Sequence, residues 1–245
     1  KIVATLGPAS DTQIAHLVEA GVDVFRLNFS HGNHEEHLAR IIRIRAAARE
    51  QGRFVAILGD LQGPKIRIGS FGENESVTLD QGSKFIISVS LGLNAGTKRE
   101  VATTYSDLPQ TLSSGDILVL GDGEVELEVT RVEQESVICR VLVGGELGSG
   151  KGINLKGGGL SAPAITEKDR ADLEFVCKNH LDYLAISFVS SADDLFLARE
   201  LVNQQGSTCR IVAKLEKLEA VASDDHIDAI ILASDAVMVA RGDLG

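Results

Sequence analysis

The segment from Tyr183 to Glu216 reads YLAISFVSSADDLFLARELVNQQGSTCRIVAKLE and decides the fold class. Both of its ends are short apolar runs, which are typical of parallel strands buried on both faces. Between them, Ser191 and Asp194 form the start signal of a helix with apolar residues at helical spacing, and Gly206 follows its end. A strand, a helix and a second strand in this order predict a βαβ unit and a parallel sheet.

The same pattern recurs on both sides of this segment. Apolar runs that predict strands occur at 1–6, 24–27, 54–58 and 236–240. A helix is expected over 33–51, with Leu38, Ile41 and Ile42 on its apolar stripe, and another is expected to begin at Thr166. The chain therefore has six predicted parallel strands, whereas a closed barrel of eight typically needs more than about 200 residues for its strands and helices.

A long interruption separates the third predicted strand from the fourth. Residues 71–162 hold 15 of the 25 glycines and contain alternating runs at 124–132 and 137–143, which indicate antiparallel strands. We therefore expect an α/β fold: a (β/α)8 TIM barrel, incomplete with six of its eight strands, and an inserted small all-β barrel domain. The expected domains are the first part of the barrel at 1–70, the β insert, acting as a lid, at 71–162, and the barrel's continuation at 163–245.

The composition limits the function classes. The chain has 245 residues and a net charge of -11, with a mean hydropathy of +0.09. This excludes a disordered chain and argues against nucleic acid or an anionic membrane as the partner. No apolar run is long enough for a membrane span. The three cysteines, Cys139, Cys177 and Cys209, are typical of buried thiols in a reducing cytoplasm.

Polar and charged residues follow the predicted strands at their carboxyl ends. In a (β/α)8 barrel these ends share one mouth, where catalytic residues lie. Any one such residue could belong to a structural ion pair, but their recurrence at successive strands predicts a site. The candidates are Arg26, Asn28, Ser30 and His31 after the second strand, Asp60, Leu61, Lys65 and Arg67 after the third, Lys214 and Glu216 after the fifth, and Gly242 and Asp243 after the sixth.

These residue types indicate a metal and an anionic substrate. Glu216 and Asp243 could hold Mg²⁺ or Mn²⁺ through carboxylate oxygens. Arg26, Arg67 and Lys214 would attract phosphate or carboxylate groups. Phosphoryl transfer and enolate chemistry both use such a set, so the residue types alone leave both open.

Two other patterns predict less. The segment from Gly145 to Lys151 begins like a phosphate-binding P-loop, but Gly152 replaces the required Ser or Thr and no helix pattern follows. The spacing of His31, His34 and His37 is that of a possible metal face. We instead expect His34 and His37 to be solvent-side residues at a helix start.

Several longer motifs resemble the pyruvate kinase family, in that family's order and over essentially the whole chain. They are Arg26–Gly32, Asp60–Arg67, Lys151–Asn154, Thr166–Asp169, Lys214–Glu216 and Met238–Gly245. The resemblance implies transfer of phosphate from phosphoenolpyruvate to ADP, giving pyruvate and ATP in the last step of glycolysis. It also implies a cytoplasmic enzyme that is a homotetramer at full length.

The resemblance further assigns roles to individual positions. It implies that Lys214 stabilises the transferring phosphoryl group and that Arg26 and Gly242 contact phosphoenolpyruvate. Glu216 and Asp243 would bind the divalent cation, Mg²⁺ or Mn²⁺. The residues implied for nucleotide and phosphate binding are Asn28, Ser30, His31, Arg67 and Lys151.

One departure from the family concerns a monovalent cation. Asn28, Ser30, Asp60 and the carbonyl of Leu61 match the potassium site of the potassium-dependent members. Many members have a glutamate where this chain has Lys65. An ammonium group there could supply the charge of the ion, so we expect K⁺ not to be required.

Two alternatives stay open. A metal-dependent aldolase or lyase would use a similar carboxylate pair, but it has no evident use for a lid that carries Lys151. The second alternative is a non-catalytic protein that acts by binding to an intact subunit. Family members are roughly twice as long, so we expect these residues to be the front half of an enzyme and to have little or no activity alone.

Overall fold

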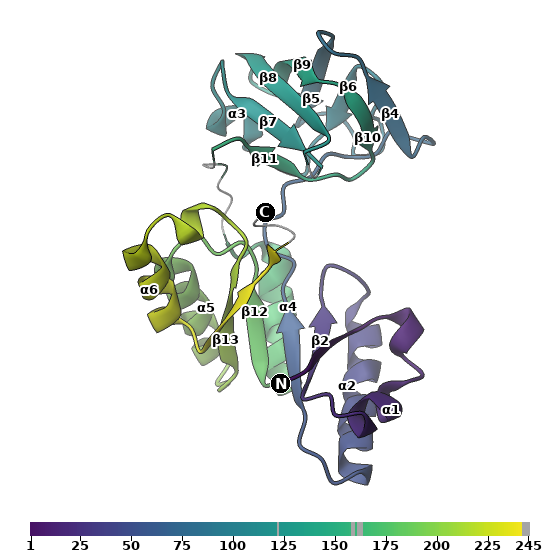
Figure 1. Cartoon of the computed structure of the whole chain (residues 1–245), viewed down its shortest axis with the longest axis vertical. Helices are drawn as coiled ribbons and strands as arrows, with labels where there is room; N and C mark the ends of the chain where they lie inside the picture. Colours follow the sequence, from purple (N-terminus) through teal and green to yellow (C-terminus); the bar gives the residue numbers. More distant parts are fainter. Residues whose placement is uncertain (122, 158–159, 161–163, 242–245) are drawn as a thin grey trace. The chain divides into compact units, whose positions relative to one another are not determined.

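The protein is described by a computed structural model that covers residues 1–121, 123–157, 160 and 164–241. It divides into two compact units. Unit 1 comprises Lys1–Pro64 and Pro163–Gly245, and unit 2 comprises Lys65–Ala162. Figure 1 shows the elements of both.

Unit 1 alternates strands with helices. Its six strands form one parallel sheet in the order β1-β2-β3-β12-β13-β14. The strands are β1 (Val3–Leu6), β2 (Val24–Asn28), β3 (Ala56–Asp60), β12 (Tyr183–Ile186), β13 (Arg210–Leu215) and β14 (Ala236–Val239). The helices are α1 (Ile14–Glu19), α2 (His34–Glu50), α4 (Glu167–Lys178), α5 (Ala192–Gln204) and α6 (Asp224–Ala233), with short 3₁₀ turns at Pro8–Ser10 and Glu219–Val221.

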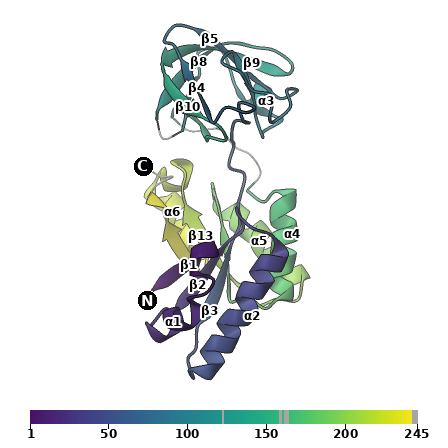
Figure 2. The same ribbon diagram turned by 90° about the vertical axis from the view of Figure 1, so that its right-hand side faces the viewer.

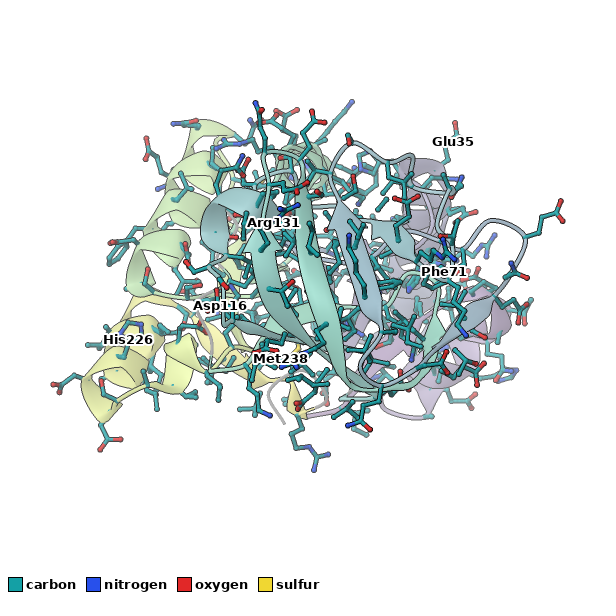
Figure 3. All side chains as sticks on the ribbon, turned by 90° about the horizontal axis from the view of Figure 1, so that it is seen from above. Glu35, Phe71, Asp116, Arg131, His226 and Met238 are labelled. Atoms are coloured by element: carbon teal, nitrogen blue, oxygen red, sulfur yellow. The ribbon has the colours of Figure 1, made fainter. Side chains whose placement is uncertain are left out.

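The helices cover one face of this sheet and form its larger core. Alternate strand residues such as Phe25, Ile57 and Ile211 are fully buried against helix residues such as Ile44 and Val176. Figure 2 shows the sheet with its helices from the side. The opposite face carries a smaller apolar cluster of Leu58, Ala185 and Val212, with Met238, labelled in Figure 3, packed against it. Apolar side chains on both faces explain why the strands read as nearly continuous apolar runs.

The helix starts predicted from the capping signals are confirmed. Thr166 and Ser191 are the N-caps of α4 and α5, and each forms a capping box with the aspartate three residues later. None of the helices within the described residues is both long and apolar enough to cross a lipid bilayer.

The apolar stripe predicted for α2 is partly wrong. Ile41 is buried, but Leu38 is 39% exposed and Ile42 is 59% exposed. The buried side of the helix instead includes His37, at 2% exposure, and Ile44. The prediction of a solvent-side His37 is therefore also wrong.

Phe29 gives the physical reason. Its buried ring lies 4.4 Å from the His37 ring, centroid to centroid. The imidazole of His37 therefore packs in the core, whereas a hydrophobicity pattern places a histidine at the surface.

Phe54 was also predicted to lie in a strand. It precedes β3 and is fully exposed.

Unit 2 is built mainly of antiparallel strands. One sheet has the order β11-β7-β8-β9-β5-β6, in which only β5 and β6 pair in parallel, and a second pairs β10 with β4. The elements are β4 (Ser76–Leu79), β5 (Lys84–Ser88), β6 (Glu100–Ala102), α3 (Leu108–Thr111), β7 (Ile117–Leu120), β8 (Val125–Val132), β9 (Ser136–Val143), β10 (Gly145–Gly148) and β11 (Ile153–Leu155). Because Gly145–Gly148 is a strand, this segment does not have the form of a P-loop, which opens a helix.

Aspartates recur at the edge of the unit 1 sheet where the strands begin. Asp23, Asp182 and Asp235 each stand one residue before a strand, namely β2, β12 and β14. Each carboxylate accepts the backbone N–H of a residue in or beside the neighbouring strand, at 2.8, 2.8 and 2.7 Å. A lysine or arginine pairs with each of the three. The sheet edge therefore has side-chain acceptors for backbone donors at alternate strands.

We predict that Asp235→Ala lowers the free energy of unfolding by about 1–3 kcal/mol, because the N–H of the fully buried Ile211 loses its acceptor. Chemical denaturation of the purified chain measures the change. Asp228→Ala, which removes an exposed carboxylate from the middle of α6, is the matched control. Equal stability of the two variants would contradict the prediction.

Candidate active site

A two-residue repeat places charged groups above the smaller apolar cluster of the unit 1 sheet. Side chains two residues apart in a strand lie on the same face. Asp60 therefore follows Leu58 on that face, and Lys214 follows Val212. Ala185 lies opposite Asp60 in the register of β12 and β3. The carboxyl ends of the strands thus carry a polar layer on top of an apolar one.

Lys214 is the centre of this polar layer. Its side chain is 10% exposed, and its ammonium has three close partners. Nζ donates to Ser187 Oγ at 2.7 Å and lies 2.8 Å from Glu216 Oε1 and 3.2 Å from Asp60 Oδ1. Three partners match the three N–H donors of an ammonium group.

Arg26 completes the charge balance. Its Nε donates to Asp60 Oδ2 at 2.6 Å, and its Nη1 donates to Thr5 Oγ1 on β1 at 2.9 Å. The Asp60 side chain is only 1% exposed. Two cations, Arg26 and Lys214, thus face two carboxylates, those of Asp60 and Glu216, and the pairing offsets the cost of burying the charges.

Glu216 is held in place by the backbone after β12. Its Oε2 accepts the N–H of Phe188 at 2.7 Å. Phe188 has a φ of 55°, which is the left-handed region that side chains other than glycine rarely adopt. A strained residue of this kind at a charged cluster is typical of a functional site, where its surroundings hold it in place.

Glu216, one of the two residues predicted to bind the divalent cation, has oxygen atoms that suit a hard cation. Among the residues that the structure describes, Lys214 pairs with one Glu216 oxygen and the Phe188 N–H donates to the other, which leaves lone pairs on both for a ligand. Asp243, the other predicted ligand, and Gly242 lie outside the described residues. Among the described residues alone, no group of three or more His, Cys, Asp or Glu side chains is arranged to hold a metal ion.

The loop after β2 brings further predicted residues to the same end of the sheet. Asn28 lies opposite Asp60 in the register of β2 and β3, and its Oδ1 accepts the N–H of Ser30 at 3.0 Å. The residues that follow, Ser30 and His31, are exposed. Leu61 continues β3, and its carbonyl accepts the Ser187 hydroxyl at 2.7 Å.

The remaining predicted residues gather within unit 2. Arg67 Nη1 donates to the carbonyl of Gly150 at 2.8 Å, and the carbonyl of Lys151 accepts the N–H of Ile68 at 2.9 Å. Lys151 Nζ pairs with Glu124 at 3.2 Å. Lys65 lies beside the same segment, since a Cβ on Gly152 would be 3.6 Å from its Cε. Two adjacent segments of unit 2 therefore present three cations.

Sequence reasoning assigned no role to Ser187. Its hydroxyl accepts from Lys214 and donates to the Leu61 carbonyl, so it joins the ends of β3, β12 and β13. Its position directly after the strand 183–186 was a usable signal. An uncharged serine is common at strand ends, and nothing in its type distinguishes this one.

The fold and the site together define a class: an α/β fold with a parallel sheet whose buried charged cluster lies at the carboxyl ends of the strands. The chain belongs to the pyruvate kinase family, because the family model for the pyruvate kinase barrel domain matches residues 1–245.

Individual relatives agree with this assignment. The chain is 49% identical to a pyruvate kinase of Haemophilus influenzae and 50% identical to pyruvate kinase II of Salmonella typhimurium, in both cases over its whole length. It also resembles the crystal structure of a pyruvate kinase from Cryptosporidium parvum, with a TM-score of 0.88 and 33% identity over the whole chain. The chain spans only about half the length of these proteins, 52%, 51% and 51% respectively.

We predict that Ser187→Ala lowers the free energy of unfolding by about 1–3 kcal/mol, because the buried Lys214 ammonium and the Leu61 carbonyl each lose a partner. Chemical denaturation is the measurement, and Ser30→Ala, at an exposed serine on the same end of the sheet, is the control. A Ser187→Ala variant as stable as the control would show that the hydroxyl is dispensable.

Proposed function

We propose that the full-length protein containing this chain transfers phosphate from phosphoenolpyruvate to ADP. The bond between the phosphorus and the enol oxygen breaks, and a bond to a β-phosphate oxygen of ADP forms. The enolate that is left takes up a proton and becomes pyruvate. The observation that carries this proposal is the balanced cluster around Lys214, in a chain that belongs to the pyruvate kinase family.

Lys214 and Arg26 are the groups that would meet the developing negative charge. Both are held by carboxylates on neighbouring strand ends, so their charges are already oriented before a substrate arrives. Preorganised charges in a largely buried site stabilise a transition state more strongly than mobile charges in water. Arg26 and Gly242 would contact phosphoenolpyruvate, and Lys214 would lie nearest the transferring group.

Glu216 and Asp243 would hold Mg²⁺ or Mn²⁺. When bound there, the cation would neutralise phosphoryl charge and align the two substrates. Glu216 also pairs with Lys214, so the same carboxylate would set the positions of both positive centres.

The residues proposed for nucleotide and phosphate binding are those that the family resemblance singles out, namely Asn28, the exposed Ser30 and His31, Arg67 and Lys151. The proposed architecture is a (β/α)8 barrel, six of whose strands lie in 1–70 and 163–245, with a β lid at 71–162. The proposed full-length enzyme is cytoplasmic and a homotetramer.

The test is the formation of pyruvate from phosphoenolpyruvate and ADP by the full-length protein. We expect Lys214→Met and the isosteric Glu216→Gln to lower kcat/KM by about 100-fold or more, the scale found when a group that stabilises a transition state is removed. Lys178→Met, at the exposed end of α4, is the control and should keep full activity. The 245-residue chain alone should have little or no turnover.

Two results would contradict the proposal. One is the absence of ADP-dependent turnover in the wild-type full-length protein. The other is the release of pyruvate from a longer keto acid without ADP, which would favour the aldolase or lyase class.

We further predict that turnover does not require K⁺. Lys65 follows Asp60 and Leu61 closely in the sequence, and its ammonium would supply the positive charge that K⁺ supplies in potassium-dependent members. Replacing K⁺ by tetramethylammonium should leave the rate nearly unchanged. Lys65→Glu should make the rate depend on K⁺, which is the matched comparison. A collapse of wild-type activity without K⁺ would disprove the prediction.

A further inference from the structure

The loop between β2 and α2 is held by side chains from two helices. This loop, residues 29–33, carries Ser30 and His31, whose side chains are exposed. The backbone carbonyls on both sides of Ser30, those of Phe29 and His31, each accept a hydrogen bond from a helix side chain. We call this set of contacts the loop clamp.

Lys168 forms the first half of the clamp. It lies in the first turn of α4, and its Nζ donates to the Phe29 carbonyl at 2.7 Å and to Asp172 Oδ2 at 2.6 Å. Asp172 is 3% exposed. Its other oxygen, Oδ1, lies 2.7 Å from Nε2 of His34, the first residue of α2. One buried carboxylate thus ties together the two helices that flank the loop.

His37 forms the second half. Its Nε2 lies 3.0 Å from the His31 carbonyl, and since a carbonyl only accepts, this nitrogen carries the hydrogen. Burial lowers the pKa of His37 below its ordinary value of 6.5 and outweighs the opposing effect of the His31 carbonyl, so the ring is neutral near pH 7. Within the described residues, its buried Nδ1 has no hydrogen-bond partner. Within the part of the chain that the structure describes, the contact of Nε2 with the loop carbonyl is therefore the ring's one hydrogen bond.

Aromatic packing also holds the residues at the start of the loop and of α2. The centroid of the Phe29 ring lies 4.4 Å from that of the His37 ring and 5.9 Å from that of the Phe175 ring. The His34 ring stacks on Phe175 at 4.4 Å. Glu35, the next residue of α2, points outward in Figure 3, so the inward contacts belong to specific residues and not to the whole helix start.

The clamp reaches the charged cluster through one further hydrogen bond. The N–H of Phe29 donates to the carbonyl of Asp60 at 2.9 Å, and Asp60 is the partner of Arg26 and Lys214. The backbone around Ser30 is therefore fixed on both sides and tied to the end of β3, while the Ser30 and His31 side chains face solvent.

We propose that Lys168, Asp172 and His37 are positioning residues that hold the exposed Ser30 and His31 in place for a phosphate-bearing ligand, the nucleoside diphosphate of the proposed reaction. None of the three needs to touch that ligand. A loop held in its binding conformation before the ligand arrives avoids the entropic cost of ordering at binding, so the clamp increases affinity without adding a contact. This inference rests on the proposed function only for the identity of the ligand.

A purely structural role for the clamp makes a different prediction. If the contacts only packed α2 against α4, then breaking them would lower the stability of unit 1 and affect both substrates alike. A positioning role predicts a selective effect on the loop and on the substrate that binds there.

The first experiment needs no activity. Backbone hydrogen exchange in residues 29–33 is compared among the wild-type chain, Lys168→Met and Lys178→Met. Lys178 lies in the same helix α4, is exposed and makes a matched control. We expect Lys168→Met alone to speed exchange in the loop by about tenfold, with exchange in β3 and β12 unchanged. Unchanged exchange in residues 29–33 would overturn the proposal that the clamp holds the loop in place.

The second experiment uses steady-state kinetics of the full-length protein. Lys168→Met and Asp172→Asn are expected to raise the KM for ADP by about tenfold or more, which corresponds to the loss of one charge-assisted hydrogen bond. The KM for phosphoenolpyruvate and the kcat should change less than twofold. Lys168→Arg, which keeps a cationic donor, should restore most of the ADP affinity. Equal changes in both KM values would support packing alone and overturn the positioning role.

The two proposals can fail separately. A wild-type full-length protein that does not use ADP refutes the proposed function, and the exchange experiment still decides whether the clamp orders the loop. An active enzyme whose KM for ADP is unchanged in Lys168→Met keeps the proposed function and refutes the positioning role.

Discussion

The Lys214 ammonium is the charge on which the carboxyl end of the sheet depends. Removing one partner of a buried ion pair leaves an uncompensated charge, at a cost of about 3–5 kcal/mol. Here Lys214 faces both Asp60 and Glu216, and Asp60 also holds Arg26. Because these residues come from β2, β3 and β13 or directly follow them, the network joins the strand ends as well as the charges. The arrangement that would stabilise a transferring phosphoryl group is thus also one that the folded sheet needs.

The two edges of the same sheet use carboxylates differently. At the amino-terminal edge, Asp23, Asp182 and Asp235 accept backbone N–H groups and pair with cations that are more than a third exposed. At the carboxyl edge, the carboxylates of Asp60 and Glu216 face cations that are themselves largely buried. Exposed pairs are screened by water and contribute little beyond the capped backbone, whereas buried pairs keep strong fields. The sheet therefore has a structural edge and an edge suited to chemistry.

The βαβ pattern, the capping boxes and the charged strand ends could be predicted because each depends on local spacing. The sequence could place Arg26, Asp60, Lys214 and Glu216 at one end of the sheet because parallel strands bring their carboxyl ends together whatever the side chains are. Ser187 was recognised only as the residue at the end of its strand and was given no role, since that role comes from Lys214 and Leu61 at the ends of other strands. His37 was placed wrongly because a hydrophobicity pattern does not register an imidazole that packs on Phe29 and donates to a carbonyl. Tertiary contacts decided both cases.

The strand-borne and loop-borne parts of the site need different kinds of support. Arg26, Asp60 and Lys214 lie within strands, so the backbone ladder fixes their Cα positions, and pairing among their side chains does the rest. Ser30 and His31 lie beyond the last ladder partner of β2 and have no such ladder. Side chains from α2 and α4 replace it by donating hydrogen bonds to the loop carbonyls and by packing against the Phe29 ring. A charged histidine at position 37 would place an unpartnered N–H in that core, and burial accordingly lowers the pKa of His37 and favours the neutral ring.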